Sequence, residues 1–357
     1  MNMLIDDSPN DIFGLTGETS HERVVVASDA ETGLKAIIAV YSTARGPAFG
    51  GCRYWHYATD QDAYIDALRL SHGMAMKNAL GGLPFGGGKA VLVANPTAKD
   101  REAMFKAFGR MVQSLGGEYL TADDVGTTVE DMLAVRSQTS FVSGISREDQ
   151  TYGGNPSPYT AYGVFVGLSA AAKMAVGVPS VEGISVAVQG LGSVGWALCE
   201  RLHDAGAKLI VADIDSSRAE LAAQRFDATV AHPDNIALLE ADVFAPCAMG
   251  GSITLDIARN CKFRIVAGGA NNQLISPVAG DILHDRNIFY APDFLINAGG
   301  IVSCAREYLG SATEEQVLNE VALIGPRLFE PWDRVRARQS SSARVVAEWA
   351  RDLIVMA

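Results

Sequence analysis

The sequence predicts a two-domain α/β protein whose C-terminal domain is a doubly wound parallel sheet. Its 357 residues exceed the roughly 100–200 residues of a single domain. Gly, Pro, Ser and Asn dominate the stretch 146–158, and apolar strands alternate with helices beyond it. We therefore expect an N-terminal α/β domain at 1–145 and a second domain at 146–329. We also expect C-terminal helices at 330–357 that pack back on the first domain.

The first domain is predicted from its apolar periodicity. After Arg23 the β-branched runs VVVASD and LKAIIAVYS predict two strands. Apolar residues at helical spacing over 62–80, followed by a pair of glycines, predict a helix. The run KAVLVANP predicts a strand at Lys89–Pro96, and helices are expected at 100–115 and 128–139.

The second domain is predicted from strand–helix–strand alternation. ISVAVQG reads as a buried strand, LGSVGWALCERLHDAG as a helix and KLIVAD as the next strand. Further strands are expected at DVFAP, RIVAGG and IFYAPD, and the last 45 residues are predicted to be helical. Because consecutive parallel strands need crossover helices, this order indicates a doubly wound sheet.

Composition and charge exclude several classes of protein. A content of 48% hydrophobic and 20% charged residues allows a large core, and a net charge of −12 argues against a nucleic-acid partner. Five cysteines, an odd number without C-x-x-C spacing, suggest neither disulfides nor a zinc site. The N-terminus lacks the pattern of a signal peptide, and Lys173 interrupts the apolar stretch Thr160–Pro179. We expect a cytoplasmic protein with no metal and no membrane partner.

A glycine-rich segment between a predicted strand and a predicted helix has the pattern G-x-G-x-x-G. Gly190 permits the tight turn, Gly192 lets the backbone approach a pyrophosphate, and Gly195 lets helix and strand pack closely. Asp213 ends the next strand, where a carboxylate binds ribose hydroxyls and repels a 2′-phosphate. The pattern therefore predicts NAD rather than NADP, although Arg218 lies near enough to weaken this preference. The candidate cofactor residues here are Gly190, Gly192, Ser193, Val194, Gly195 and Asp213.

Three glycine-rich segments of the first domain carry unusual charged groups. They are Gly46–Arg53, Gly73–Lys89, which includes Lys77, and Thr121–Thr128, which includes Asp124. Glycines beside lysine and aspartate suggest a backbone pressed close to a small ligand. Each charged residue alone could have a purely structural role, as a surface lysine or a capping aspartate, but their joint presence indicates a binding site.

At these motifs the chain resembles the Glu/Leu/Phe/Val dehydrogenase family, most closely its leucine dehydrogenase branch. The resemblance runs from about Val24 to Gly310 and includes GMAMKNA, GGGKAV, TADDVGTTVEDM, GNPSPYTAYGV, AVQGLGSVG, DVFAPCAMGG, GANNQL and YAPDFLINAGG. It implies NAD-dependent, reversible oxidative deamination of a small apolar L-amino acid, leucine or another branched-chain one, to its 2-oxo acid and ammonia. It also implies a homo-oligomer.

The resemblance implies a role for each matching residue. Lys77 would bind the substrate carboxylate, Lys89 would polarise the attacking water and the carbonyl, and Asp124 would be the acid/base. Gly50 would hold its backbone against the substrate carboxylate. The remaining implied contacts are Asn271 near substrate and nicotinamide, Thr160 at the nicotinamide carboxamide, and Ala248 in the cofactor groove.

The implied chemistry explains these residue types. Hydride leaves the substrate Cα, water adds to the iminium ion and ammonia departs. The later steps move protons, which requires an acid/base tuned near neutral pH. A cationic lysine stabilises the oxyanion that forms. The reaction also requires a cleft that closes, and we expect a hinge near 140–155.

The side-chain pocket departs from the family pattern. Phe49 stands where the leucine enzymes have leucine, and the other pocket positions fall on Ile301 and Cys304, the latter smaller than the usual valine. Phe49 is alternatively a core residue. Two other functions remain open: an aromatic amino-acid dehydrogenase, suggested by GGLPFGGGK, and an inactive NAD-binding protein. The presence of Lys77, Lys89 and Asp124 argues against the inactive protein.

Overall fold

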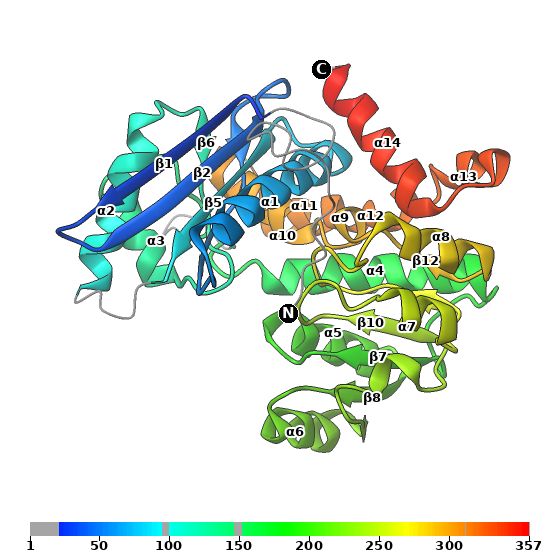
Figure 1. The fold of residues 1–357 in the computed structure, drawn as a ribbon. Coiled ribbons are helices and arrows are strands. Elements are labelled where there is room, and N and C mark those ends of the chain that lie inside the picture. The colour runs from blue at the N-terminus through cyan, green and yellow to red at the C-terminus, as the bar shows by residue number, and fades with distance from the viewer. Residues whose placement is uncertain (1–20, 95–99, 146–151, 311, 357) are drawn as a thin grey trace. The chain divides into compact units, whose positions relative to one another are not determined.

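The computed structural model describes residues 21–94, 100–145, 152–310 and 312–356 (Figure 1). The chain divides into two compact units: unit 1 is Met1–Ser146 with Ile354–Ala357, and unit 2 is Arg147–Leu353. The break expected at 146–158 and the hinge expected near 140–155 both include residues 146–151, which lie outside the described residues. In the part that is described, no helix is both long and apolar enough to cross a membrane.

Unit 1 is built on a mixed sheet. Its order is β1-β2-β5-β3-β6, and β4 pairs with β5 beyond the end of β3. β1, β2 and β5 pair antiparallel, whereas β3, β4 and β6 pair parallel with their neighbours. The elements are β1 (Arg23–Asp29), β2 (Leu34–Ser42), β3 (Ala48–Phe49), β4 (Cys52–Trp55), α1 (Asp60–Leu80), β5 (Gly86–Val93), α2 (Arg101–Ser114), β6 (Tyr119–Leu120) and α3 (Val129–Arg136).

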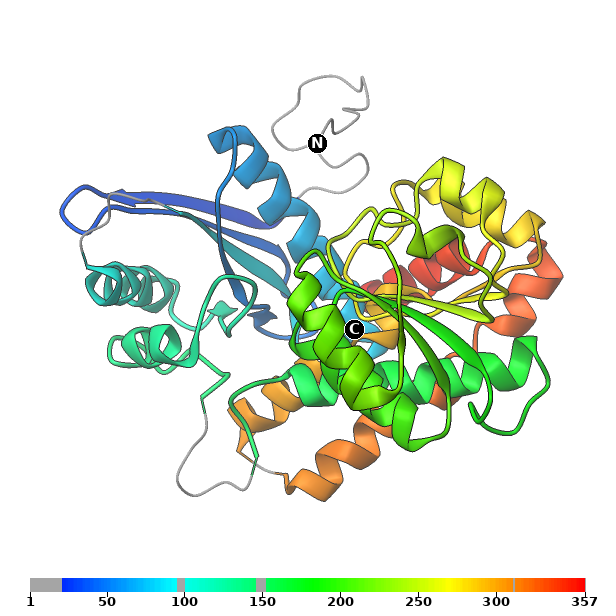
Figure 2. The same cartoon turned by 90° about the horizontal axis from the view of Figure 1, so that it is seen from below.

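Helices cover both faces of this sheet because its strands are apolar on both sides. Alternate residues of β2 belong to different clusters: Ile38 and Val40 pack with α2 and α3, whereas Ile37 and Ala39 pack with α1. Figure 2 shows α1 on one side of the sheet and the other two helices opposite. The helices and the long strands predicted for this domain are thus confirmed, whereas β3, β4 and β6 were missed.

Unit 2 contains a six-stranded parallel sheet in the order β12-β11-β10-β7-β8-β9. The strands are β7 (Ser185–Gln189), β8 (Lys208–Ala212), β9 (Thr229–Val230), β10 (Val243–Pro246), β11 (Ile265–Val266) and β12 (Phe289–Tyr290). Numbered from β7, this order is the 3-2-1-4-5-6 of dinucleotide-binding domains, with the topological switch point between β7 and β10. The predicted α/β class and the doubly wound sheet are therefore confirmed.

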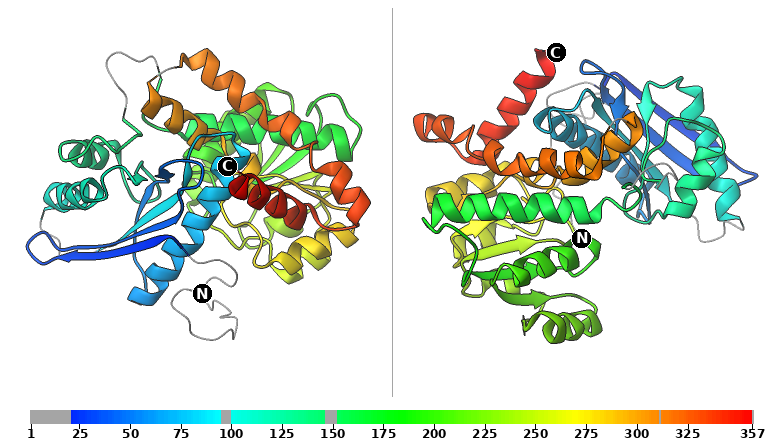
Figure 3. Two further views of the ribbon diagram at one scale, coloured as in Figure 1. Left: turned by 90° about the horizontal axis from the view of Figure 1, so that it is seen from above. Right: turned by 180° about the vertical axis from the view of Figure 1, so that it is seen from behind.

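Helices lie on both faces of the second sheet. The segments η1 (Ile236–Leu238), α7 (Leu255–Asn260) and α8 (Pro277–Asp285) cover one face. On the other, α4 (Ser157–Ala175) packs against α5 (Ser193–Asp204), and α10 (Gly299–Leu309), α11 (Glu314–Ala322) and α12 (Ile324–Arg327) lie along α4 (Figure 3). The remaining helices of this part are α6 (Ser216–Phe226) and α9 (Asp293–Ile296).

The C-terminal helices are α13 (Trp332–Arg338) and α14 (Ser342–Val355), in the part of the chain where helices were predicted. Trp332 stacks on Phe289 with ring centroids 4.2 Å apart, and Arg344 donates from Nε and Nη2 to Asp281 at 2.8 and 2.6 Å. Both contacts hold these helices to unit 2. The chain up to Leu353 belongs to unit 2, and the chain from Ile354 belongs to unit 1. The expectation that 330–357 packs back on the first domain stays a prediction.

Candidate active site

Lys89 and Asp124 form a buried ion pair in unit 1. Lys89 lies within β5 and is 5% exposed, and its Nζ is 2.8 Å from Asp124 Oδ2. Asp124 follows β6 in a turn, where its backbone N–H donates to Thr127 Oγ1 at 2.9 Å. Lysine is almost never buried without a partner. The carboxylate of Asp124 is therefore the partner that allows the Lys89 ammonium to be buried.

A third charged residue, Arg53 of β4, contacts the same carboxylate. Its Nε donates to Asp124 Oδ2 at 3.2 Å, and its Nη1 donates to Asp66 Oδ2 at 3.0 Å. Asp66 lies on α1, and the arginine side chain is 15% exposed. Asp124 thus faces two cations on neighbouring strands, and Arg53 links it to a second carboxylate.

These two cations determine the ionisation of Asp124. Burial would raise the pKa of this carboxyl, but the positive charges of Lys89 and Arg53 outweigh burial and hold the pKa well below its usual range. The reaction implied by the sequence requires an acid/base tuned near neutral pH. In the structure Asp124 is instead a carboxylate at neutral pH, and its basicity increases only if one cation moves away.

Lys77 lies on an element that packs directly against the strand of Lys89. It is half-buried in the last turn of α1, and α1 packs on β5. The next residue, Asn78, is fully buried and donates from Nδ2 to the carbonyl oxygens of Phe49 and Gly86, at 3.0 and 2.6 Å. This amide fixes the end of α1 against β3 and β5, and so positions the two lysine-bearing elements together.

Gly50 lies between β3 and β4, where a side chain has no room. A Cβ at this position would lie 1.9 Å from the carbonyl oxygen of Gly88. The Gly50 N–H donates to the carbonyl of Leu120 at 3.2 Å, and its carbonyl accepts the hydroxyl of Tyr119 at 2.6 Å. Packing therefore explains this glycine, and its contact with a substrate carboxylate stays a prediction.

The expected side-chain pocket is buried. The Phe49 side chain is 0% exposed and lies edge-on to Phe85, with ring centroids 5.2 Å apart. This environment favours the core interpretation of Phe49 over the pocket interpretation. Ile301 and Cys304 are also buried, on α10 of unit 2, and are 9% and 4% exposed. Their contact with substrate stays a prediction.

The glycine-rich loop of unit 2 has the geometry that its motif predicts. Gly190 has φ 92°, and a Cβ there would lie 2.8 Å from that of Ala248. A Cβ on Gly195 would lie 1.9 Å from the Gly190 carbonyl oxygen, whereas one on Gly192 would meet no protein atom within 4 Å. The first residues of α5 are Ser193 and Val194, and no side chain caps this helix. Open space at Gly192 beside an uncapped helix N-terminus suits a pyrophosphate.

Asp213 follows β8 and holds the glycine-rich loop. Its Oδ2 accepts the Leu191 N–H at 2.6 Å, and its Oδ1 accepts the Asp215 N–H at 2.9 Å. Each carboxylate oxygen has a second lone pair for a ribose hydroxyl. Arg218 pairs with Asp215 at 3.6 Å, and both side chains are more than half exposed, so this pair is weak.

The remaining candidate residues of unit 2 lie on three segments. Thr160 is in the first turn of α4, where its Oγ1 donates to the Pro156 carbonyl at 3.2 Å. Asn271 is exposed after β11, and its Oδ1 accepts from Asn297 Nδ2 at 2.8 Å. Ala248 is exposed after β10, beside the glycine-rich loop. Thr160, Asn271 and Ala248 all lie in unit 2, and their contacts with a cofactor stay predictions.

Arg53, Asp66 and Asn297 were not predicted from the sequence as parts of these sites. Each lies inside or beside a motif that was singled out, but none carries a signal of its own. Arg53 and Asp124 are 71 residues apart, and Asn297 and Asn271 are 26 apart. An arginine two positions after a Gly-Gly pair is the one feature of the sequence that points to Arg53, because a charged side chain at a tightly packed turn needs a partner.

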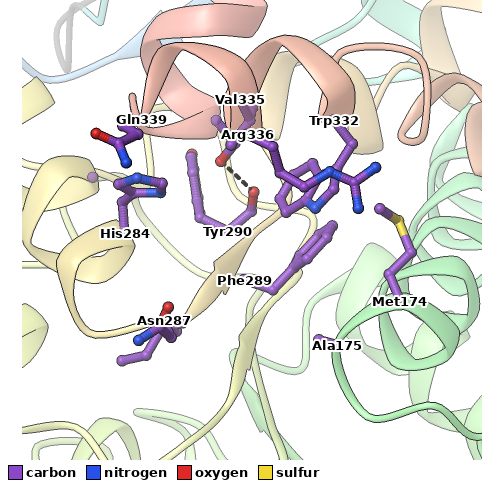
Figure 4. A pocket seen from close by; sticks show the side chains of 13 residues that line it. Met174, Ala175, His284, Asn287, Phe289, Tyr290, Trp332, Val335, Arg336 and Gln339 are labelled. Atoms are coloured by element: carbon purple, nitrogen blue, oxygen red, sulfur yellow. Dashed lines mark hydrogen bonds between the residues drawn. The ribbon is translucent and has the colours of Figure 1, made fainter.

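A separate cavity of about 300 Å³ lies elsewhere in unit 2 (Figure 4). It is lined by the end of α4, at Met174, and by the stacked rings of Phe289 and Trp332. Met174 is 14 residues beyond Thr160 on the same helix, which corresponds to roughly 21 Å. This cavity is therefore distinct from the cofactor residues near the start of α4.

Two family models match almost the whole chain. A model described as Glu/Leu/Phe/Val dehydrogenase, dimerisation domain, matches residues 21–141. A model described as Glutamate/Leucine/Phenylalanine/Valine dehydrogenase matches 155–219 and 211–343. The two ranges correspond to the two units of the structure.

Individual proteins are similar over most of their length. The chain is 50% identical to a leucine dehydrogenase of Thermoactinomyces intermedius, over 90% of this chain and 87% of that protein. It is 43% identical to a valine dehydrogenase of Streptomyces virginiae, over 81% and 82%. The crystal structure of L-tryptophan dehydrogenase from Nostoc punctiforme superposes with a TM-score of 0.78 at 36% identity, covering 94% of this chain and 96% of that one.

Proposed function

Because the chain belongs to the Glutamate/Leucine/Phenylalanine/Valine dehydrogenase family, we propose that it catalyses the NAD-dependent oxidative deamination of a branched-chain L-amino acid. The products are the 2-oxo acid and ammonia, and the reaction is reversible. Leucine is the substrate we expect to be preferred, since leucine dehydrogenases are 45–50% identical to this chain. The resemblance inferred from the motifs is thereby confirmed at the level of the family.

The observation that carries this proposal is the buried pair of Lys89 and Asp124. An ammonium and a carboxylate 2.8 Å apart are the two groups that a reaction with an oxyanion and a proton transfer requires. An inactive NAD-binding protein would have no reason to retain them, because burying an ion pair contributes little to stability.

NAD fits the glycine-rich loop better than NADP. Open space at Gly192 and the uncapped start of α5 suit the pyrophosphate. Asp213 suits the ribose hydroxyls and repels a 2′-phosphate. When bound, the nicotinamide supplies the hydride acceptor for the substrate Cα.

The residues of unit 1 supply the remaining chemistry. Lys77 holds the substrate carboxylate through its charge. Asp124 takes a proton from the water that adds to the iminium carbon and returns it to the departing amine. Lys89 donates to the oxygen of the carbinolamine and stabilises its developing negative charge. For this step the ammonium of Lys89 must turn from Asp124 Oδ2 to the substrate oxygen.

A substrate panel tests the proposal. The purified protein is mixed with NAD and with leucine, valine, isoleucine or phenylalanine, and NADH absorbance is followed. We expect the highest kcat/KM with an aliphatic substrate. The Asp124→Asn variant should retain no more than about one per cent of the wild-type kcat/KM, because such a group contributes about 10²–10⁴-fold. A higher kcat/KM for phenylalanine would instead indicate an aromatic amino-acid dehydrogenase, and no turnover with any amino acid would indicate a binding protein.

We also propose a cytoplasmic homo-oligomer. All five cysteines are free thiols, as a reducing compartment would keep them. β1 is an edge strand of its sheet with Val26 66% exposed, and an exposed apolar edge is a site for pairing with another chain. Light scattering coupled to gel filtration measures the mass, and a monomer would contradict this.

A further inference from the structure

Arg53 belongs to a chain of contacts behind the carboxylate of Asp124. From Asp124 the chain runs through Arg53 to Asp66, whose Oδ2 also accepts the hydroxyl of Tyr57 at 2.6 Å. We propose that Arg53 is a positioning residue, which keeps Asp124 in place when Lys89 turns from Asp124 to the substrate oxygen. The inference rests on the proposed function, because that function gives Lys89 its second partner.

The geometry separates a movable cation from a fixed one. Lys89 Nζ and Arg53 Nε both contact Asp124 Oδ2, at 2.8 and 3.2 Å. A lysine ammonium is a single point on a flexible stem, whereas the guanidinium is a rigid fork. Arg53 uses one arm of the fork on Asp124 and another on Asp66. It therefore stays in place when Lys89 leaves, and Asp124 retains one cation.

Charge balance supports the same assignment. The cluster contains two cations, Lys89 and Arg53, and two carboxylates, Asp124 and Asp66. The carboxylate side chains are 17% and 25% exposed. If Lys89 serves the substrate, Arg53 is the only cation of the cluster that still contacts either carboxylate. Without Arg53 neither carboxylate would contact a cation of the cluster, and this loss is costly for the more buried Asp124.

Other groups near Asp124 do not replace this cation. Cys52, beside Arg53 on β4, has its pKa raised by burial to about 12 and stays a neutral thiol. Burial and the hydrogen bond to Asp66 raise the pKa of Tyr57, so its hydroxyl stays protonated. Asp123, adjacent to Asp124, adds negative charge. The positive charge that faces Asp124 thus comes from Lys89 on β5 and Arg53 on β4.

The main variant is Arg53→Met, which keeps the apolar stem but removes the charge and both hydrogen bonds. We expect the pKa of Asp124 to rise by about 1–3 units, the range for loss of a neighbouring cation. The acid limb of the kcat/KM profile should move to higher pH accordingly. Loss of position should lower kcat by about 10²-fold, with a smaller change in KM for leucine, since Lys77 is untouched.

Three further variants separate positioning from folding. Arg53→Lys keeps the positive charge but cannot contact both carboxylates. Compared with Arg53→Met, it should bring the acid limb of the pH profile closer to wild type than it brings kcat. The double variant Arg53→Met/Asp66→Asn removes one cation and one anion together and so preserves the charge balance. It replaces Arg53→Met in the test if the single variant folds poorly. Arg344→Gln is the matched control, because it breaks an arginine–aspartate pair in unit 2, and we expect kcat and the pH profile to remain unchanged.

The experiment measures kcat, KM and the pH profile for all variants with leucine and NAD. In parallel, the carboxyl ¹³C resonance of Asp124 is titrated in wild type and Arg53→Met, with Asp124→Asn identifying the signal. Unchanged kcat and an unchanged acid limb in a folded Arg53→Met protein would overturn the inference. If the wild type has no turnover with any amino acid, the proposed function fails. The titration then shows separately whether Arg53 controls Asp124.

Discussion

Replacing Phe49 with alanine distinguishes a core residue from a specificity residue. The side chain is 0% exposed and lies edge-on to Phe85. Truncation of a buried phenylalanine costs about 3–5 kcal/mol, to which the lost aromatic pair contributes about 0.5–1.5 kcal/mol. We expect Phe49→Ala to lower the midpoint of thermal unfolding clearly and to leave the ratio of leucine to phenylalanine kcat/KM unchanged.

The assay combines thermal unfolding, followed by circular dichroism, with the substrate panel. Phe108→Ala is the matched control, because Phe108 is also fully buried in unit 1, in the cluster of α2 and α3. Both variants should lose stability by similar amounts. A core role for Phe49 is contradicted if Phe49→Ala keeps its stability while kcat/KM for phenylalanine rises relative to leucine by the equivalent of about 1–3 kcal/mol, the value of a few methylenes in a pocket. Phe49 would then contact the substrate.

Three other predictions address the cofactor loop and the acid/base. Gly192→Ala should leave thermal stability unchanged, because its Cβ meets no protein atom within 4 Å, but should raise KM for NAD. Gly195→Ala should destabilise the fold, because its Cβ would lie 1.9 Å from a carbonyl oxygen. Asp213→Ala should raise kcat/KM for NADP relative to NAD; an unchanged ratio would count against the ribose contact. Asp124 has its pKa held low by Lys89 despite burial. Its contribution to stability is therefore complete above the unfolded pKa of about 3.9 and is lost only as pH falls through the lower folded value. The difference in unfolding midpoint between wild type and Asp124→Asn should thus stay constant from about pH 8 to pH 5, and a decline within that window would contradict the low pKa.

The long elements of this fold were predictable because each carries its own periodic signal. β2 buries seven of its nine residues in alternating directions, and its sequence LKAIIAVYS is accordingly apolar almost throughout. β3 and β6, by contrast, have two residues each, too few for any periodicity. β3 pairs with β5, which Gly50 approaches closely, and β6 pairs with β3. Only the tertiary structure supplies these pairings.

The partners of the C-terminal helices could not be predicted for a similar reason. Their polar faces and apolar stripes predict helices but not the surface that the stripes cover. In the structure Trp332 stacks on Phe289, and Arg344 donates hydrogen bonds to Asp281. These partners lie 43 and 63 residues earlier in the chain, and neither pair is marked in the sequence by spacing or motif.

The two parts of the candidate site differ in how far apart their determinants lie along the chain. In the cofactor loop, Gly195 is required by the carbonyl of Gly190, five residues earlier, so one short motif contains both the constraint and its cause. In unit 1, the state of Asp124 depends on Lys89 from β5 and on Arg53 from β4, which is 71 residues away. A motif can identify Asp124 as a reactive group, but its ionisation depends on two strands, β4 and β5, that lie beside the turn after β6. The implied reaction therefore could not predict the pKa of Asp124, because the pKa of a buried carboxyl is determined by its neighbours and not by its role.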